Sequence, residues 1–290
     1  MSRQVRVVTD STSYLPDDLI AKHAIGVTRL QVTVGDRIGL EGTDVSPGDV
    51  AAALSAKKRV STSLPSPASV DQAIRDAAAG DHDVCVVHLS SVLSGTYAAT
   101  RARAGALETE LGISIEVVDS RQVAMGLGFA VLSATAAAEQ GKPVTEVAAA
   151  AARTASHTEC YFLVDTLEHL RRGGRLNASQ ALLGTALSIK PILEVRDGAV
   201  VVKEKVRTTA RALDRLEQLA IQAASGASVR VAVHHLAAAD AAAILVDRLA
   251  TSLPLAEPAI VCEVGAVVGA HVGPGLLGVV VSLANGRRES

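Results

Sequence analysis

The sequence predicts an α/β protein with two domains. Short runs of β-branched residues alternate with Ala-rich stretches through the first half, which is typical of a parallel sheet with crossover helices. The second half contains further strand-like runs and an Asp-Gly turn within VRDGAVV, which indicates an antiparallel hairpin. A chain of 290 residues is also longer than one hydrophobic core usually grows. We therefore expect a Rossmann-like parallel-sheet domain over 1–155 and an α/β domain with a mixed or antiparallel sheet over 156–290.

Three apolar runs in the first half end in polar residues. They are VRVVTDST (5–12), DVCVVHLS (83–90) and ISIEVVDS (113–120). Because the carboxyl ends of parallel strands lie at one edge of a sheet, residues 10–11, 90–91 and 119–120 are expected to cluster there. Ligands bind at this edge in open α/β sheets, so a site is expected among these residues.

The remaining elements follow from composition, caps and breakers. Helices are predicted over 69–79, 96–111, 126–140 and 144–157. Strands are predicted over 161–165, 191–207, 228–236, 259–265 and 277–283.

Composition excludes several classes of protein. Apolar residues make up 49% and charged residues 20% of the chain, and no stretch approaches the roughly 20 apolar residues of a membrane span. The N-terminus enters a strand-like segment at once, so we expect no signal peptide, a cytoplasmic protein and at most transient membrane contact. A net charge of −2 argues against a nucleic-acid-binding protein.

Known cofactor and metal motifs are missing from the sequence. It contains no GxxxxGK[ST], GxSxG, HExxH or paired CxxC motif. Cys85, Cys160 and Cys262 have no metal-ligand spacing and are expected to be reduced and buried. No metal or cofactor is therefore expected.

Three hydroxyl- and glycine-rich segments suit a carboxylate or phosphate. They are TSLPSP (62–67), LSSVLSGTYAAT (89–100) and GAHVGPG (269–275). Such loops present small donors and backbone N–H groups to an anion. The candidate anion-binding residues are Thr62, Ser63, Ser94, Gly95, Thr96 and His271. The alternatives stay open at this point, since Ser94 can be a simple helix cap and a single histidine such as His271 is often structural.

Positive charge is concentrated between Arg171 and Arg215. This segment has ten Lys and Arg residues against four Asp and Glu residues. Arg171, Arg172 and Arg175 can form a basic rim that docks an acidic partner or faces a phosphate. The alternative is a solvated helix end whose cations complement the helix dipole.

Separated motifs in a fixed order resemble the DegV family of bacterial fatty-acid-binding proteins. The matching segments are VVTDST, TSxPSP at 62–67, LSSxLSGTY at 89–97, VDSRQVAMGLG at 118–128, DTLEHLRRGGR at 165–175, LLGTALSIKPIL at 182–193 and VGAHVGPGLLGV at 268–279. One departure is Leu64, where the family often has Gln.

The resemblance implies a two-domain carrier rather than an enzyme. It implies a long-chain fatty acid whose carboxylate is held by Thr62, Ser94 and His271, and a separate ATP-dependent kinase that phosphorylates this carboxyl group for phospholipid synthesis. It also favours Arg172 or Arg175 as the residue that faces the phosphate or the kinase.

Two other functions are kept as alternatives. An acyl hydrolase would use Ser94 as nucleophile and His271 as base, with Asp10 or Asp119 orienting the base, although the chain lacks a nucleophile elbow. A regulator would bind fatty acid and report it to another protein.

Overall fold

The computed structural model describes residues 3–176 and 190–284, so most of the 182–193 motif lies outside the described residues. The chain folds as two compact units. Unit 1 takes the residues up to Gln31 together with Ser63–Ser156, and unit 2 takes Val32–Thr62 together with the residues from His157 on. The later division, at Ser156 and His157, lies next to the predicted boundary at 155. The prediction assigned residues 32–62 to the N-terminal domain, whereas in the structure they group with the C-terminal half.

A four-stranded parallel sheet forms the centre of unit 1. Its strand order is β2-β1-β6-β7, and every neighbouring pair is parallel. The strands are β2 (Gly26–Thr28), β1 (Val5–Asp10), β6 (Asp83–His88) and β7 (Ile115–Asp119). Strands β1 and β6 are buried almost throughout, as expected for a sheet covered on both faces.

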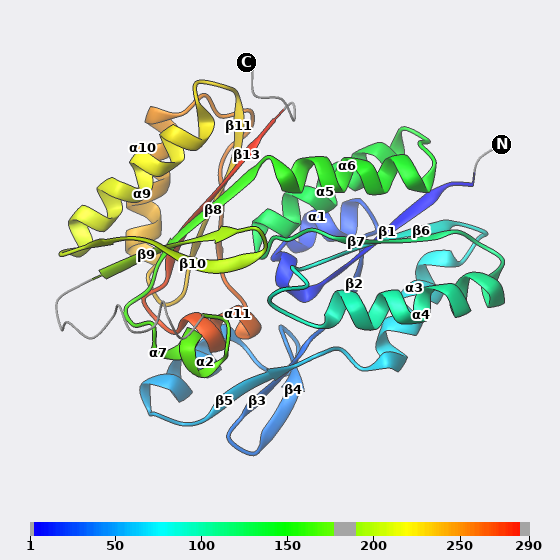
Figure 1. Ribbon diagram of the computed structural model, residues 1–290, viewed down its shortest axis with the longest axis horizontal. Coiled ribbons are helices and arrows are strands. Elements are labelled where there is room, and N and C mark those ends of the chain that lie inside the picture. Colours follow the sequence, from blue (N-terminus) through cyan, green and yellow to red (C-terminus); the bar gives the residue numbers. More distant parts are fainter. Residues whose placement is uncertain (1–2, 177–189, 285–290) are drawn as a thin grey trace. The chain divides into compact units, whose positions relative to one another are not determined.

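Helices cover both faces of this sheet (Figure 1). Helices α3 (Pro67–Ala78) and α4 (Thr96–Leu111) share a core with the strands that is centred on Ile74, Val86 and Leu107. Helices α5 (Met125–Glu139) and α6 (Val144–Ser156) contact the strands and each other. The short 3-10 helix η1 (Ser11–Ser13) and α1 (Asp17–Lys22) connect β1 to β2. The predicted parallel-sheet domain is therefore confirmed.

Unit 2 contains a six-stranded mixed sheet with the order β10-β9-β8-β13-β11-β12. These strands are β10 (Ala199–Val206), β9 (Lys190–Arg196), β8 (Thr158–Leu163), β13 (Leu277–Leu283), β11 (Val229–His235) and β12 (Ile260–Glu263). Within the described strands of this sheet, β11 and β12 pair in parallel, and the other neighbouring pairs are antiparallel. The predicted Asp-Gly hairpin joins β9 to β10, with positive φ at Asp197 and Gly198 as a type I′ turn requires.

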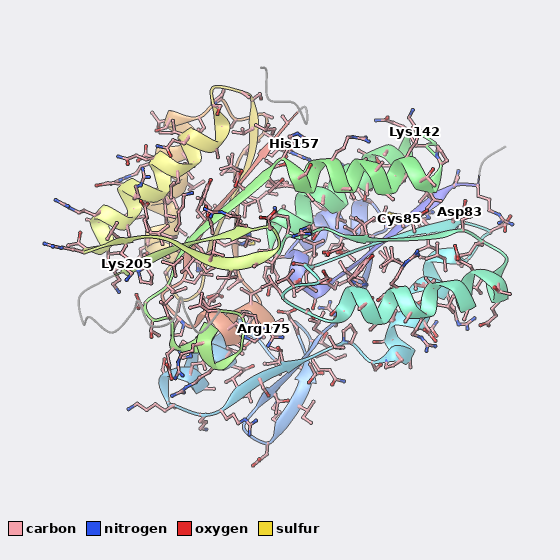
Figure 2. All side chains as sticks on the ribbon, viewed as in Figure 1. Asp83, Cys85, Lys142, His157, Arg175 and Lys205 are labelled. Atoms are coloured by element: carbon pink, nitrogen blue, oxygen red, sulfur yellow. The ribbon has the colours of Figure 1, made fainter. Side chains whose placement is uncertain are left out.

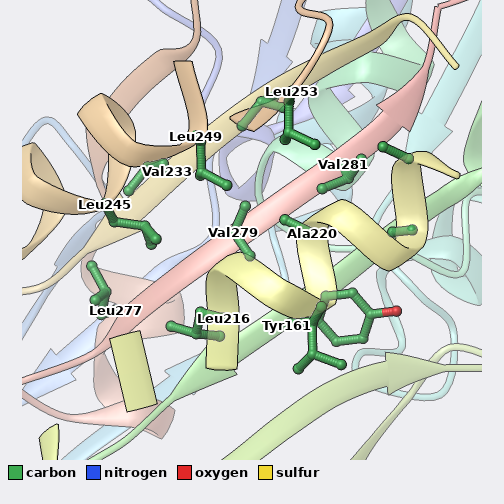
Figure 3. Close-up of a cluster of buried hydrophobic side chains, with 14 of the residues drawn as sticks. Tyr161, Leu216, Ala220, Val233, Leu245, Leu249, Leu253, Leu277, Val279 and Val281 are labelled. Atoms are coloured by element: carbon green, nitrogen blue, oxygen red, sulfur yellow. The ribbon is translucent and has the colours of Figure 1, made fainter. Parts of the chain in front are cut away.

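Two helices cover one face of the mixed sheet. Helix α9 (Thr209–Ala224) and helix α10 (Ala239–Ser252) contact its strands and each other. Figure 3 shows Leu216 and Ala220 from α9, and Leu245 and Leu249 from α10, around Val279 of β13. This aliphatic core packs both helices against the sheet.

The shorter elements of unit 2 carry most of the predicted site residues. A three-stranded sheet has the order β4-β3-β5. Its strands are β4 (Arg37–Leu40), β3 (Gln31–Val34) and β5 (Val60–Ser63), and α2 (Pro47–Ser55) precedes β5. Helix α11 (Ala266–Val272) contacts both α2 and α7 (Glu168–Arg172). These contacts bring β5, α7 and α11 into one region of unit 2.

Candidate functional site

Thr62 and His271 meet in unit 2. The Thr62 Oγ1 and His271 Nε2 atoms are 2.9 Å apart, although 209 residues separate them along the chain. Thr62 comes from β5 and His271 from α11. Two of the residues predicted to bind an anion therefore form one hydrogen-bonded pair.

His271 differs from the sequence-based prediction in its local structure. The prediction placed it in the glycine-rich 269–275 loop, but it lies in helix α11 and its Nδ1 atom is buried. Burial and the nearby positive charge of Arg175 lower the pKa of His271 from 6.5 to about 4. The imidazole is therefore neutral at pH 7.

The His271 ring has one hydrogen-bonding atom left over. Nε2 is used by Thr62, whereas Nδ1 has no hydrogen-bond partner among the described residues. If Nε2 accepts the Thr62 proton, Nδ1 carries a free N–H; if Nε2 donates, Nδ1 is a free acceptor. In the first tautomer a carboxylate would complete the ring's hydrogen bonding.

Gly173 makes room for the His271 imidazole. A Cβ atom at residue 173 would lie 2.1 Å from His271 Nδ1, so any side chain there would force the imidazole to move. Gly173 follows α7 directly and has ordinary right-handed helical angles, so its need for glycine is steric and not conformational. The sequence analysis considered the charge of this segment and did not predict the close approach of Gly173 to His271.

The three arginines of the predicted basic rim fall into two groups. Glu168 lies 2.9 Å from the Arg171 guanidinium and 2.6 Å from that of Arg172, and both arginines are exposed. The same two arginines lower the pKa of the Glu168 carboxyl, mainly through the Arg171 hydrogen bond. This acid, which the sequence analysis did not include, partly neutralises the rim.

Arg175 belongs with His271 rather than with the exposed pair. It is half-buried, burial lowers its pKa, and its Nη1 atom donates to the Gly173 carbonyl over 2.5 Å. Figure 2 labels Arg175 at the end of the α7 segment. A cation is thus held next to the neutral imidazole, which favours an anion at this position.

Ser94, Gly95 and Thr96 lie together at the start of α4 in unit 1. Ser94 Oγ is 2.9 Å from Thr96 Oγ1 and 3.4 Å from the Thr96 N–H nitrogen. The cap position is Gly95, and no side chain caps this helix, so Ser94 is not its N-cap residue. Leu64 lies beside Gly95, since a Cβ there would be 3.6 Å from Leu64 Cδ1. Ser63, at the end of β5, is exposed.

The polar residues at the carboxyl edge of the parallel sheet pair with one another. The Ser91 hydroxyl donates to Asp119 over 2.5 Å, and Ser11 Oγ accepts from the Leu30 N–H over 3.1 Å. His88 lies 2.9 Å from Asp10, whose oxygens also accept from two backbone N–H groups. The hydrolase alternative needs Asp10 or Asp119 to orient His271, and both carboxylates have other partners within unit 1.

The described parts of the chain contain neither a metal-binding cluster nor a membrane-spanning helix. Within residues 3–176 and 190–284, no group of three or more His, Cys, Asp or Glu side chains is placed so that it could hold a metal ion. Within the same residues, no helix is both long and apolar enough to cross a bilayer.

Comparisons with known proteins cover nearly the whole chain. A family model described as "Uncharacterised protein, DegV family" matches residues 4–284. A DegV domain-containing protein of Streptomyces coelicolor is 47% identical over 97% of this chain and 99% of its own length. DegV domain-containing proteins of Mycobacterium tuberculosis are 38% identical over 96% of this chain and 97% of their own length.

Solved structures have the same fold. A DegV family protein from Thermus thermophilus, described by its fatty-acid binding, superposes with a TM-score of 0.89 at 31% identity, covering 97% of this chain and 99% of that one. A fatty-acid-binding DegV from Bacillus subtilis superposes with a TM-score of 0.86 at 30% identity, covering 97% of this chain and 100% of that one.

Proposed function

Because the chain belongs to the DegV family, we propose that it is a carrier that binds one long-chain fatty acid and presents the carboxylate to a separate ATP-dependent kinase. Similar solved proteins from two bacteria are described as binding fatty acids, which supports the choice of ligand. In this proposal the chain holds its ligand and catalyses no reaction alone.

The observation that carries the proposal is the Thr62–His271 pair. The neutral imidazole has a buried Nδ1 without a partner among the described residues, and the Arg175 cation lies nearby. A carboxylate accepts hydrogen bonds and carries one negative charge, so it matches a neighbouring cation and the Nδ1–H that the imidazole presents when Nε2 accepts the Thr62 proton. In this arrangement the imidazole donates to one carboxylate oxygen, and the Thr62 hydroxyl holds the ring in the tautomer that can donate.

The full head-group assignment of the proposal rests on the family resemblance. We assign Thr62, Ser63 and His271 together with Ser94, Gly95 and Thr96 to the same carboxylate, on the motifs shared with the family. The uncapped start of α4 and the Ser94 and Thr96 hydroxyls supply donors of the kind a carboxylate needs. A double-mutant cycle between Thr62→Val and Ser94→Ala tests this, because residues that share one ligand give non-additive losses.

The acyl chain provides most of the affinity in this proposal. Each buried methylene contributes about 0.8 kcal/mol, so a sixteen-carbon chain gives on the order of 10 kcal/mol before the costs of binding. The protein has no Trp and only two Phe, so aliphatic side chains are expected to line the chain-binding region.

The first experiment is native mass spectrometry of freshly purified protein, followed by denaturing extraction of the bound molecule. One fatty acid per chain is expected. Protein that is free of lipid and that also fails to take up added palmitate would overturn the proposal. Titration of Thr62→Val and of the control Ser61→Ala, an exposed neighbour on β5, then tests the head-group assignment, and only Thr62→Val is expected to weaken palmitate binding.

The kinase step needs its own test. The carrier loaded with palmitate is mixed with ATP and a bacterial fatty-acid kinase, and acyl phosphate is trapped with hydroxylamine. We expect acyl hydroxamate only when carrier, kinase and ATP are all present. Product from the carrier without the kinase would contradict the role of a carrier.

A further inference from the structure

Unit 1 contains a buried polar chain that the proposed function does not use. Asp10 ends β1, His88 ends β6, and Thr100 lies in the second turn of α4. All three residues are completely buried. His88 Nδ1 is 2.9 Å from Asp10 Oδ2, and His88 Nε2 is 2.8 Å from Thr100 Oγ1. Buried polar groups are costly unless paired, so such a chain needs an explanation.

The surrounding hydrogen bonds fix which atom donates and which accepts in the Asp10–His88–Thr100 series. Asp10 Oδ2 also accepts from the Leu89 N–H over 2.9 Å, and Oδ1 accepts from the Thr12 N–H over 3.1 Å. Both carboxylate oxygens therefore act as acceptors, so His88 Nδ1 is the donor to Asp10. That tautomer leaves Nε2 to accept the Thr100 hydroxyl proton, which orients all three side chains.

His88 connects the two ends of the loop that carries Ser94. The loop begins at Leu89, directly after His88, and α4 begins at Thr96, four residues before Thr100. Inside the loop, Ser94 N–H bonds the Ser90 carbonyl over 3.0 Å, Ser90 N–H bonds the Gln122 carbonyl over 2.8 Å, and the Ser91 hydroxyl bonds Asp119 of β7. The His88–Thr100 bond spans the loop, and Asp10 ties its first residue to β1.

We infer that Asp10, His88 and Thr100 are positioning residues that hold the 89–96 loop so that Ser94 can meet a carboxylate. The expected effect on carboxylate binding rests on the proposed function, whereas the effect on the 89–96 loop follows from the hydrogen bonds alone. Without the Thr100 hydroxyl, His88 Nε2 would be buried without a partner, and the loop would have to shift or admit water to satisfy it. Fatty-acid head-group recognition should therefore depend on three residues that do not touch the ligand.

Hydrogen exchange tests the structural part without any ligand. Thr100→Val removes one hydroxyl at nearly constant volume, Thr100→Ser restores it, and Thr135→Val is the matched control, a buried hydroxyl that bonds the Val131 carbonyl within α5. Amides in 89–96 should exchange about five- to tenfold faster in Thr100→Val alone, as expected for one buried hydrogen bond. Unchanged exchange there, or an equal rise throughout unit 1, would overturn the inference.

Ligand titration tests the functional part with palmitate and hexadecanol, which share a long hydrocarbon chain but differ in head group. Thr100→Val should weaken palmitate binding about fivefold and leave hexadecanol binding unchanged, with recovery in Thr100→Ser. Equal losses for both ligands, or none, would contradict a positioning role. If the unmodified protein binds neither ligand, the proposed function fails, and the hydrogen-exchange result still decides whether Asp10, His88 and Thr100 position the loop.

Discussion

Gly173 and His271 lie so close together that no side chain fits at residue 173. A second contact of the same kind joins the same two segments with the roles exchanged. A Cβ at Gly273, which follows α11, would lie 2.4 Å from His169 Cδ2 of α7. Each of α7 and α11 thus contributes a histidine that rests on a glycine following the other helix. This reciprocal arrangement fixes the distance between the basic α7 segment and the imidazole proposed to hold the carboxylate.

Gly173→Ala should displace the His271 ring and break its bond to Thr62. The backbone of Gly173 suits alanine, so the loss comes from the overlap with the ring, and we expect palmitate affinity to fall at least about tenfold. The matched control is Gly174→Ala, where no atom lies within 4 Å and only a left-handed backbone cost of about 1 kcal/mol is expected. Calorimetric titration of both variants checks this, and equal affinities would contradict the steric explanation.

Ligand binding should raise the pKa of His271. In the free protein, burial and Arg175 hold it at about 4, whereas a bound carboxylate places a negative charge beside the ring and favours its protonated form. NMR titration of the His271 ring with and without palmitate measures the difference. Hexadecanol, which has no charge, should leave the pKa unchanged. A His271 pKa that does not respond to palmitate would place the head group elsewhere.

Acid should destabilise the protein partly through His271 and His234. Both have pKa values of about 4 because of burial, against 6.5 when unfolded, so the unfolded state binds more protons between these values. The contribution of each histidine is present above pH 6.5 and is lost as the pH falls towards 4. On going from pH 7 to pH 5, the free energy of unfolding is expected to fall by about 2 kcal/mol for each of these histidines.

Urea unfolding at the two pH values checks this expectation. His271→Gln should lose less stability than the unmodified protein on going from pH 7 to pH 5, by about 2 kcal/mol. An identical loss in both proteins would show that His271 is not held neutral by the fold.

Sequence patterns predicted the secondary structure of unit 1 well because its signals are local. The helix predicted over 96–111 has those bounds in the structure, and the Asp-Gly turn of unit 2 was also recognised. Helix α11 was missed because Gly269 within it, and the glycines that flank it, lower helix propensity. Contacts formed only in the fold stabilise it, including the Glu41 carboxylate, which accepts from the Val267 N–H over 2.8 Å.

The candidate site was predicted by residue type but not by geometry. Hydroxyl-rich motifs identified Thr62 and His271, yet nothing local in the sequence indicates that they pair across 209 residues. The same holds for His88 and Thr100, which were not singled out, because Val-rich strands and Ala-rich helices commonly contain such residues. Close approaches like that of Gly173 become visible only when the backbone is placed.

Charge changes at Arg172 and Arg175 should have different effects. Arg172 is exposed and paired with Glu168, so Arg172→Glu should leave palmitate affinity within about twofold while weakening transfer to the kinase, because reversing a rim charge mainly changes partner association. Arg175 is half-buried next to His271, so Arg175→Gln should weaken palmitate binding and let the His271 pKa rise. Affinity and acyl-phosphate formation are measured for both variants, with Arg153→Glu, on α6 of unit 1, as a control for net charge. If Arg172→Glu lost palmitate as strongly as Arg175→Gln, the division of the rim into a partner-facing and a head-group arginine would be wrong.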